Sequence, residues 1–83
     1  MYRLEIRETA EKQMRRLPAN VFSSINDKIL ALREEPRPHG VKKLAGGLGW
    51  RIRVGEWRVI YEVDDEHSRV VIAAVKSRQS AYK

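Results

Sequence analysis

With 83 residues, the chain can form one small domain spanning residues 1–83, and it has no room for a second. Its composition, 42% hydrophobic and 34% charged residues, is typical of a globular protein and excludes a fully disordered one. The absence of cysteine excludes disulfides, a thiolate nucleophile and cysteine-ligated zinc, and fits a reducing compartment.

The formal net charge of +6 is unevenly distributed. Residues 1–36 carry seven Lys or Arg against six Asp or Glu, whereas residues 37–83 carry ten against five. A basic half suits a phosphate backbone, an anionic membrane or an acidic protein partner. No apolar run approaches the roughly 20 residues of a membrane span, and no apolar leader follows Met1, so we expect no membrane partner and a cytoplasmic protein.

The first third of the chain predicts a strand and two helices. Residues 2–6 alternate apolar and charged side chains, as in a half-buried strand. Thr9 is a plausible N-cap for a short helix that Pro18 ends. A longer helix is predicted from about Ala19 to Glu35 by an apolar stripe at helical spacing, which comprises Val21 or Phe22, Ile25, Ile29 and Leu32.

Residues 36–49 are rich in Pro and Gly and predict a loop, in which Lys42 and Lys43 extend the basic half of the chain. The two histidines, His39 and His67, lie apart from each other and from any ligand-like spacing of acids, so we expect no metal site.

Residues 50–63, WRIRVGEWRVIYEV, predict a β-hairpin with Gly55 and Glu56 as its two-residue loop. Gly at the first loop position suits a type II′ turn, and this register places Arg53 opposite Arg58. Because side chains alternate along a strand, one face is apolar and comprises Trp50, Ile52, Val54, Trp57, Val59 and Tyr61. The other face comprises Arg51, Arg53, Arg58 and Ile60.

Arg53 opposite Arg58 is a poor choice for stability, since like charges on neighbouring strands destabilise a sheet by a few tenths of a kcal/mol up to about 1 kcal/mol. A bound polyanion would explain the arginines. The alternative is an ordinary solvated strand face with a chance excess of arginine.

After the hairpin, residues 64–68 predict a solvated acidic turn, and residues 69–75, RVVIAAV, predict a strand buried on both faces that pairs antiparallel with the strand before it. A polar, basic tail follows. The order β-α-α-β-β-β predicts an α+β fold in which two N-terminal helices pack on one face of a small, mainly antiparallel sheet. The arginine face of the hairpin is then the open face.

The order of elements, the segment R-V-G-E-W-R-V-I-Y-E-V, the β-branched strand and the ending V-K-S-R-x-x-x-Y resemble the RelE/ParE toxin superfamily, and specifically its RelE-like branch, over nearly the whole chain. The resemblance implies a toxin of a type II toxin–antitoxin system that is held inactive by a cognate acidic antitoxin. In the RelE branch it also implies a metal-independent endoribonuclease without a cofactor, which cuts mRNA in the ribosomal A site and contacts ribosomal RNA.

The resemblance also implies the site residues. RelE-like enzymes use basic residues on the strand entering the hairpin, an arginine on the next strand, an arginine after the last strand and a tyrosine near the C-terminus. These positions correspond to catalytic Arg53, Arg58, Arg78 and Tyr82, with Arg51, Lys42, Lys43 and Lys76 as further RNA-binding residues. Guanidinium groups would stabilise the charge that develops on the phosphorane as a ribose 2′-OH attacks, and an aromatic ring would stack a base.

Two features depart from the family pattern. The strand positions hold arginine, which is a poor base because its pKa lies above about 12. The family's Gly-His or Gly-Lys before the final arginine is Lys76-Ser77 here. The proton acceptor is therefore open between Lys76, Tyr82 and a ribosomal group.

Two alternatives differ in function class. A ParE-like protein would use the same fold to inhibit DNA gyrase, although proteins of that type generally lack the full basic and tyrosine set. A non-enzymatic RNA-binding module would grip phosphates without cutting, with an affinity that falls steeply with salt.

Overall fold

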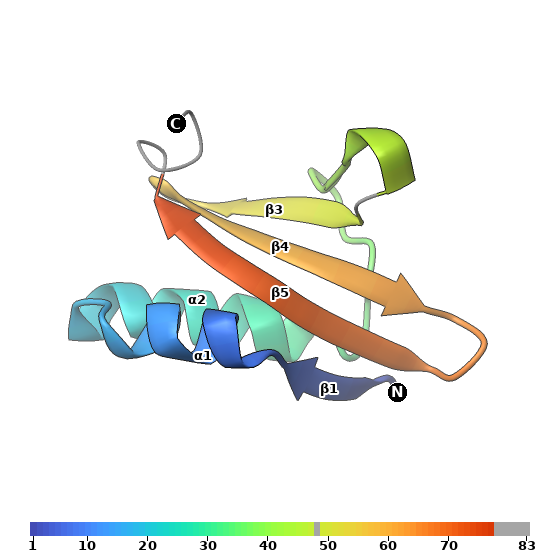
Figure 1. Cartoon of the computed structure of the whole chain (residues 1–83), viewed down its shortest axis with the longest axis horizontal. Coiled ribbons are helices and arrows are strands. Elements are labelled where there is room, and N and C mark those ends of the chain that lie inside the picture. The colour runs from blue at the N-terminus through green and yellow to red at the C-terminus, as the bar shows by residue number, and fades with distance from the viewer. Residues whose placement is uncertain (48, 78–83) are drawn as a thin grey trace.

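The computed structural model describes residues 1–47 and 49–77. Its elements in chain order are β1 (Arg3–Ile6), α1 (Glu8–Arg15), α2 (Ala19–Ala31), β2 (Lys42–Lys43), the 3₁₀ turn η1 (Ala45–Gly47), β3 (Trp50–Val54), β4 (Trp57–Asp64) and β5 (Arg69–Ser77). Both helices lie against one side of the sheet (Figure 1), which confirms the predicted α+β fold. None of the helices in this described part is long and apolar enough to cross a bilayer.

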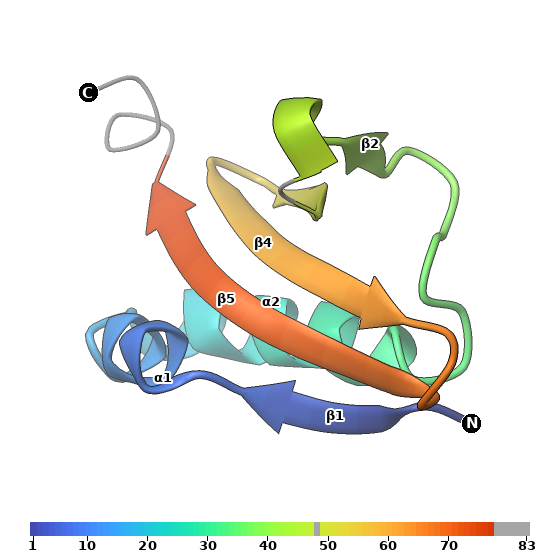
Figure 2. The same ribbon diagram turned by 45° about the vertical axis from the view of Figure 1, so that its right-hand side comes forward.

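The sheet has the strand order β1-β5-β4-β3-β2. β1 runs parallel to β5, whereas the other three neighbouring pairs are antiparallel, so the prediction of a mainly antiparallel sheet is confirmed. Figure 2 shows β1 beside the first half of β5, with β4 on the other side of β5. The N-terminal strand therefore closes one edge of the sheet, and the hairpin of β3 and β4 extends from the other side of β5.

The helix boundaries differ from the prediction. Thr9 is not the N-cap: α1 begins at Glu8 and Arg7 occupies the capping position without a side-chain hydrogen bond. Glu8 and Glu11 lie in the first turn instead, where acidic groups favour the positive end of the helix dipole. α2 ends at Ala31 rather than near Glu35, since the next three amides bond to carbonyls three residues back and tighten the chain into turns.

The core lies between the sheet and the helices. It is formed by the buried side chains of Ala10, Met14, Ile25, Ile29, Leu32, Ile52, Val59, Tyr61, Val70, Ile72 and Val75. Ile25 and Ile29 of the predicted stripe are among them, as is Leu32 just after α2, while Val21 is half-buried and Phe22 is 41% exposed. Val71 is also buried, on the opposite side of β5 from Val70, as expected for a strand that is buried on both faces.

Residues 36–49 are not all loop, because the two-residue strand β2 pairs with the start of β3 and the turn η1 follows it. Two lysines with no apolar alternation give no strand signal, so this strand escapes a prediction from pattern. The preceding segment is fixed by Tyr61, whose hydroxyl donates a hydrogen bond of 2.7 Å to the carbonyl oxygen of Pro36. Burial raises the pKa of Tyr61 to about 12.

Candidate functional site

The hairpin has the predicted register. Arg53 pairs with Arg58 and Val54 pairs with Trp57, on either side of the Gly55-Glu56 loop. Of the two loop residues only Gly55 has a positive φ, of 60°, which is the pattern of a type II′ turn. The predicted apolar face therefore packs on the core, and the arginine face lies on the side of the sheet away from the helices.

Pairing across the sheet brings three cationic residues into one line. Arg53 on β3 is opposite Arg58 on β4, and Arg58 is opposite Lys76 on β5. Directly opposed residues on antiparallel strands have Cβ atoms about 4.5–5.5 Å apart. We call Arg53, Arg58 and Lys76 the basic row.

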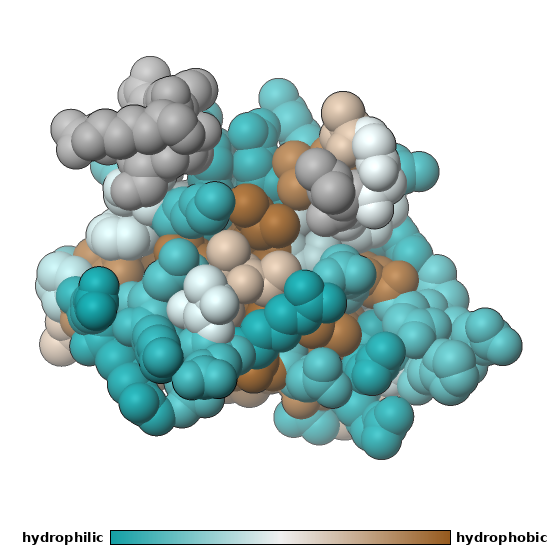
Figure 3. Space-filling view, in the orientation of Figure 1, coloured by the Kyte–Doolittle hydropathy of each residue, from teal (hydrophilic) through white to brown (hydrophobic). Residues whose placement is uncertain are grey.

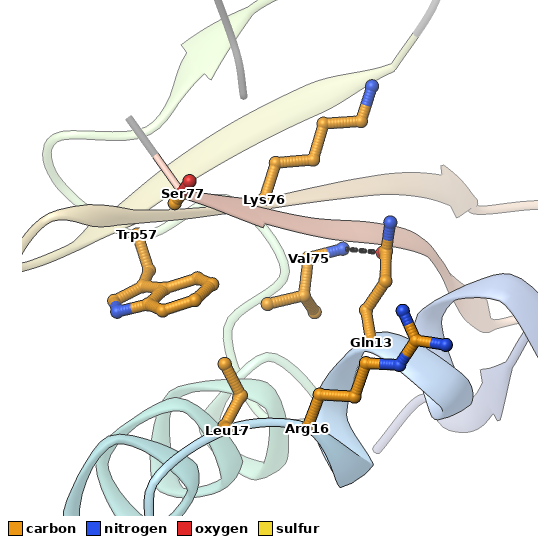
Figure 4. A pocket seen from close by; sticks show the side chains of 7 residues that line it. All are labelled: Gln13, Arg16, Leu17, Trp57, Val75, Lys76 and Ser77. Carbon is orange, nitrogen blue, oxygen red and sulfur yellow. Dashed lines mark hydrogen bonds between the residues drawn. The ribbon is translucent and has the colours of Figure 1, made fainter. Parts of the chain in front are cut away.

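Two further cations lie beside the basic row. Arg51 is two residues from Arg53 on the same face of β3, and Lys42 on β2 pairs with Arg51. In Figure 4 the Lys76 side chain extends from β5 on the side opposite to Val75 and Trp57, which point toward the helices. The basic row therefore has Arg51 and Lys42 as neighbours on one open face.

The members of the basic row differ in exposure. Arg53 and Lys76 are exposed, whereas Arg58 is only 5% exposed. Arg58 lies on the central strand with a cationic neighbour on each side. Its backbone is thus fixed by strand pairing on both sides, and its side chain is the most buried of the basic row.

Lys43 does not join the open face. It pairs with Trp50, so its side chain lies on the other side of β2, and its Nζ is 6.0 Å from the centre of the Trp50 ring. Arg37 lies 5.3 Å from the same ring. Although Lys42 and Lys43 are neighbours in sequence, alternation along the strand separates them, so a contact of Lys43 with RNA bound on the open face stays a prediction.

Acidic residues gather at the opposite end of the sheet, around the β4–β5 turn. Asp65 accepts a hydrogen bond of 2.6 Å from Arg37 and one of 2.7 Å from the hydroxyl of Tyr2. These bonds, led by the one from Arg37, lower the pKa of Asp65. Asp64 bonds to His67, which lowers the pKa of Asp64, and it also pairs with Arg69. The predicted solvated turn is therefore fastened by ion pairs.

None of the ion pairs between described residues involves Arg51, Arg53 or Lys76. The hairpin end of the open face is thus positive, and the end near the β4–β5 turn is largely neutralised. A dense group of like charges is suited to a phosphate backbone.

Two of the predicted site residues, Arg78 and Tyr82, lie outside the described residues. The described chain leads to them through Ser77, the last residue of β5, which pairs with Trp57 at the end of the sheet that carries the basic row. Below this end, a pocket of about 330 Å³ separates the C-terminal part of α1 from the sheet (Figure 4). There the side-chain oxygen of Gln13 accepts a hydrogen bond of 2.6 Å from the Val75 amide and ties α1 to β5.

Prediction from sequence missed one group on the open face. Glu62 and Arg7 form an ion pair of 2.7 Å that reaches across β5, beside the hydrophobic centre of the face. Alternation from Arg58 through Ile60 already places Glu62 on this face, but the pairing with Arg7 depends on the parallel contact of β1 with β5. No local pattern indicates that contact.

The comparison with models of protein families shows which family this chain belongs to. The model for the ParE toxin of type II toxin–antitoxin systems, parDE, matches residues 4–82. This chain belongs to the RelE/ParE toxin superfamily. It is accordingly a toxin of a type II toxin–antitoxin system.

Relatives and solved structures place the chain near the RelE members of the superfamily. Toxin RelG of Mycobacterium tuberculosis is 30% identical over 86 residues, covering 99% of this chain and 97% of that protein. The putative toxin RelE1 of Methanocaldococcus jannaschii is 28% identical, with coverage of 99% and 96%.

Among solved structures, the archaeal RelE–RelB complex from Pyrococcus horikoshii has a TM-score of 0.83 at 30% identity, over 93% of this chain and 94% of that one. The intact Escherichia coli RelBE toxin–antitoxin complex has a TM-score of 0.81 at 29% identity, with coverage of 93% and 96%. In both structures the RelE-type toxin is bound to its antitoxin.

Proposed function

We propose that this toxin is an endoribonuclease that cleaves mRNA on the ribosome. The observation that carries the proposal is the basic row, in which Arg53, Arg58 and Lys76 are opposed on three adjacent strands of an open sheet face. Like charges on neighbouring strands destabilise a sheet, and a bound anion would offset this cost. Arg51 and Lys42 extend the basic row, so the face can bind more than one anionic group. A nucleic-acid backbone supplies such groups, because its phosphodiesters recur along the chain.

The proposed reaction is attack of a ribose 2′-oxygen on the adjacent phosphorus. The bond from phosphorus to the 5′-oxygen of the next nucleotide breaks, which leaves a 2′,3′-cyclic phosphate and a 5′-hydroxyl. Negative charge grows on the non-bridging oxygens, and arginine can donate two parallel hydrogen bonds to them. Removing one preorganised donor of this kind from an enzyme lowers kcat by about 10²–10³-fold.

Each proton transfer needs a group other than a guanidinium. Lys76 is the described residue of the basic row that can exchange a proton, and it lies directly opposite Arg58. Tyr82 or a ribosomal group remains an alternative acceptor. No metal ion or cofactor takes part in the proposed reaction.

Arg78 and Tyr82 complete the proposed site. Arg78 directly follows Ser77 in the sequence and would add a guanidinium group, and Tyr82 would stack a base of the mRNA. The substrate is mRNA in the ribosomal A site, in the cytoplasm, with ribosomal RNA as a further contact. The partner that silences the toxin is a cognate acidic antitoxin, in keeping with the excess of positive charge.

A second candidate function is inhibition of DNA gyrase, because the matching family model is that of the ParE toxin. Induction of the toxin in a bacterial host separates the two functions. Ribonuclease activity predicts an immediate halt in protein synthesis with new transcript ends inside coding regions. Gyrase inhibition predicts DNA damage while translation initially continues, and that result would contradict the proposal.

A further inference from the structure

A shallow pocket of about 370 Å³ lies next to the basic row on the open face. Its floor is hydrophobic and is formed by Ile60, Ala73 and Ala74. Ala74 pairs with Ile60, and Ala73 is an extra residue of β5, because the next paired residues are Tyr61 and Ile72. Figure 3 shows hydrophobic surface in the middle of the molecule with hydrophilic residues around it.

The pocket lies within the length of one nucleotide from the proposed reaction centre. Ile60 is two residues from Arg58 along β4, and Ala74 is two residues from Lys76 along β5, a separation of about 7 Å. This spacing is close to that between the base and the phosphate of one nucleotide. A phosphate on the basic row would therefore place an adjoining base over the small, apolar floor.

The far end of the pocket carries the ion pair between Glu62 and Arg7. An acid beside a phosphate-binding face weakens RNA binding unless it contacts a hydrogen-bond donor of the RNA. Arg7 binds the Oε2 atom of Glu62 at 2.7 Å and thereby orients the carboxylate. A carboxylate has about four acceptor positions, and the Glu62 side chain is 48% exposed, so it can still accept from a ligand.

We propose that this pocket holds a guanine base of the RNA and that Glu62 is the residue that selects it. The inference rests on the proposed ribonuclease function. Guanine presents two adjacent donors on its Watson–Crick edge, the N1–H and the 2-amino group, which match the two oxygens of a carboxylate. Uracil presents one N–H between two carbonyl oxygens, which a carboxylate repels. Arg7 is then a positioning residue for Glu62.

The test is to map cleavage sites on ribosome-bound transcripts with the unaltered protein and with Glu62→Gln, Arg7→Gln and Glu66→Gln. Glu66 is an exposed acid in the β4–β5 turn and is the control for lost negative charge. A well-formed bidentate contact to a base contributes about 1–3 kcal/mol of discrimination, which corresponds to a preference of roughly 5-fold to 150-fold. We expect Glu62→Gln to lose the preference for guanine by about tenfold or more, while Glu66→Gln keeps it.

Arg7→Gln distinguishes recognition of guanine by Glu62 from a purely structural role of the ion pair. This variant breaks the same ion pair but leaves the carboxylate of Glu62 in place. Recognition predicts that Arg7→Gln retains a guanine preference that Glu62→Gln lacks. If both variants keep the base profile of the unaltered protein, or if both lose it equally with equal losses in thermal stability, the inference is overturned. If the unaltered protein makes no cuts at all, the ribonuclease proposal itself fails and takes this inference with it.

Discussion

At Arg53, the requirements of folding and of the proposed anion binding conflict. The exposed guanidinium group lies opposite Arg58 and has no ion pair among the described residues. Replacing it with a neutral polar residue should relieve repulsion in the sheet. The same change should remove a group that would donate hydrogen bonds to a phosphate. This makes stability and activity change in opposite directions, which a purely structural arginine would not do.

We therefore expect Arg53→Gln to raise the free energy of unfolding by about 0.2–1 kcal/mol and to lower the rate of RNA cleavage by about 10²-fold. Urea unfolding and a cleavage time course measure the two effects. Lys28→Gln is the matched control, because it removes one positive charge from the exposed side of α2. Arg53→Gln lowering stability as well as activity would show that this arginine serves the fold.

Tyr61 is a second residue with a measurable signature. Its pKa is raised to about 12 from an ordinary value of 10.0, because the buried phenol resists ionisation in the folded protein. Because the pKa is raised in the folded protein, the contribution of the Tyr61 hydroxyl to the free energy of unfolding is complete below pH 10. This contribution is lost as the pH rises toward 12. The difference in unfolding free energy between the unaltered protein and Tyr61→Phe should therefore shrink across this range. A difference that is independent of pH would indicate that the hydroxyl is hydrated.

At the level of elements, the hairpin depends on a glycine at its entrance as well as on the one in its loop. Gly49 immediately precedes β3 and has a φ of 103°, and a Cβ atom there would collide with the backbone carbonyl oxygen of Tyr61. Gly40 has a φ of 90°, but a Cβ atom there would meet no atom within 4 Å. Both glycines thus have a positive φ, but only at Gly49 would a side chain collide with a neighbouring atom.

We expect Gly49→Ala to destabilise the protein by about 1–3 kcal/mol more than Gly40→Ala, because only the former forces the hairpin backbone apart. Chemical denaturation of the two variants gives this difference directly. Equal losses would mean that the approach of Gly49 to β4 is relaxed in solution.

The elements that sequence predicts well are those whose pattern is local. The hairpin register follows from alternation and the Gly55-Glu56 turn, and the α2 core stripe follows from helical spacing, with Ile25 and Ile29 both fully buried. The missed features depend on distant partners. The strand at Lys42 exists only because β3 offers it an edge, and the parallel pairing of β1 joins segments more than 60 residues apart.

The candidate site divides in the same way. Arg51, Arg53 and Arg58 share a face because of local alternation, so counting residues finds them. Placing Lys76 opposite Arg58 requires the register of β5, which a bulge shifts partway along. Sequence alone also assigns Lys42 and Lys43 to one group, whereas strand geometry puts them on opposite sides.

Considered as a whole, the molecule divides its charge along the sheet. Carboxylates near the β4–β5 turn hold Arg37 and Arg69, whereas none of the ion pairs between described residues involves Arg51, Arg53 or Lys76. Such a division leaves a positive region for the proposed RNA substrate, and for the proposed acidic antitoxin that would compete with it. Binding without cutting would make use of the same charge, so affinity alone does not identify an enzyme.

The most direct test is chemical analysis of transcript ends after incubation of purified toxin with programmed ribosomes. The account predicts new 5′-hydroxyl ends paired with 2′,3′-cyclic phosphates at the A-site codon, reduced about 10²-fold or more by Arg58→Gln and unaffected by Lys28→Gln. Intact transcripts in the presence of bound toxin, or equal cutting by Arg58→Gln, would contradict it.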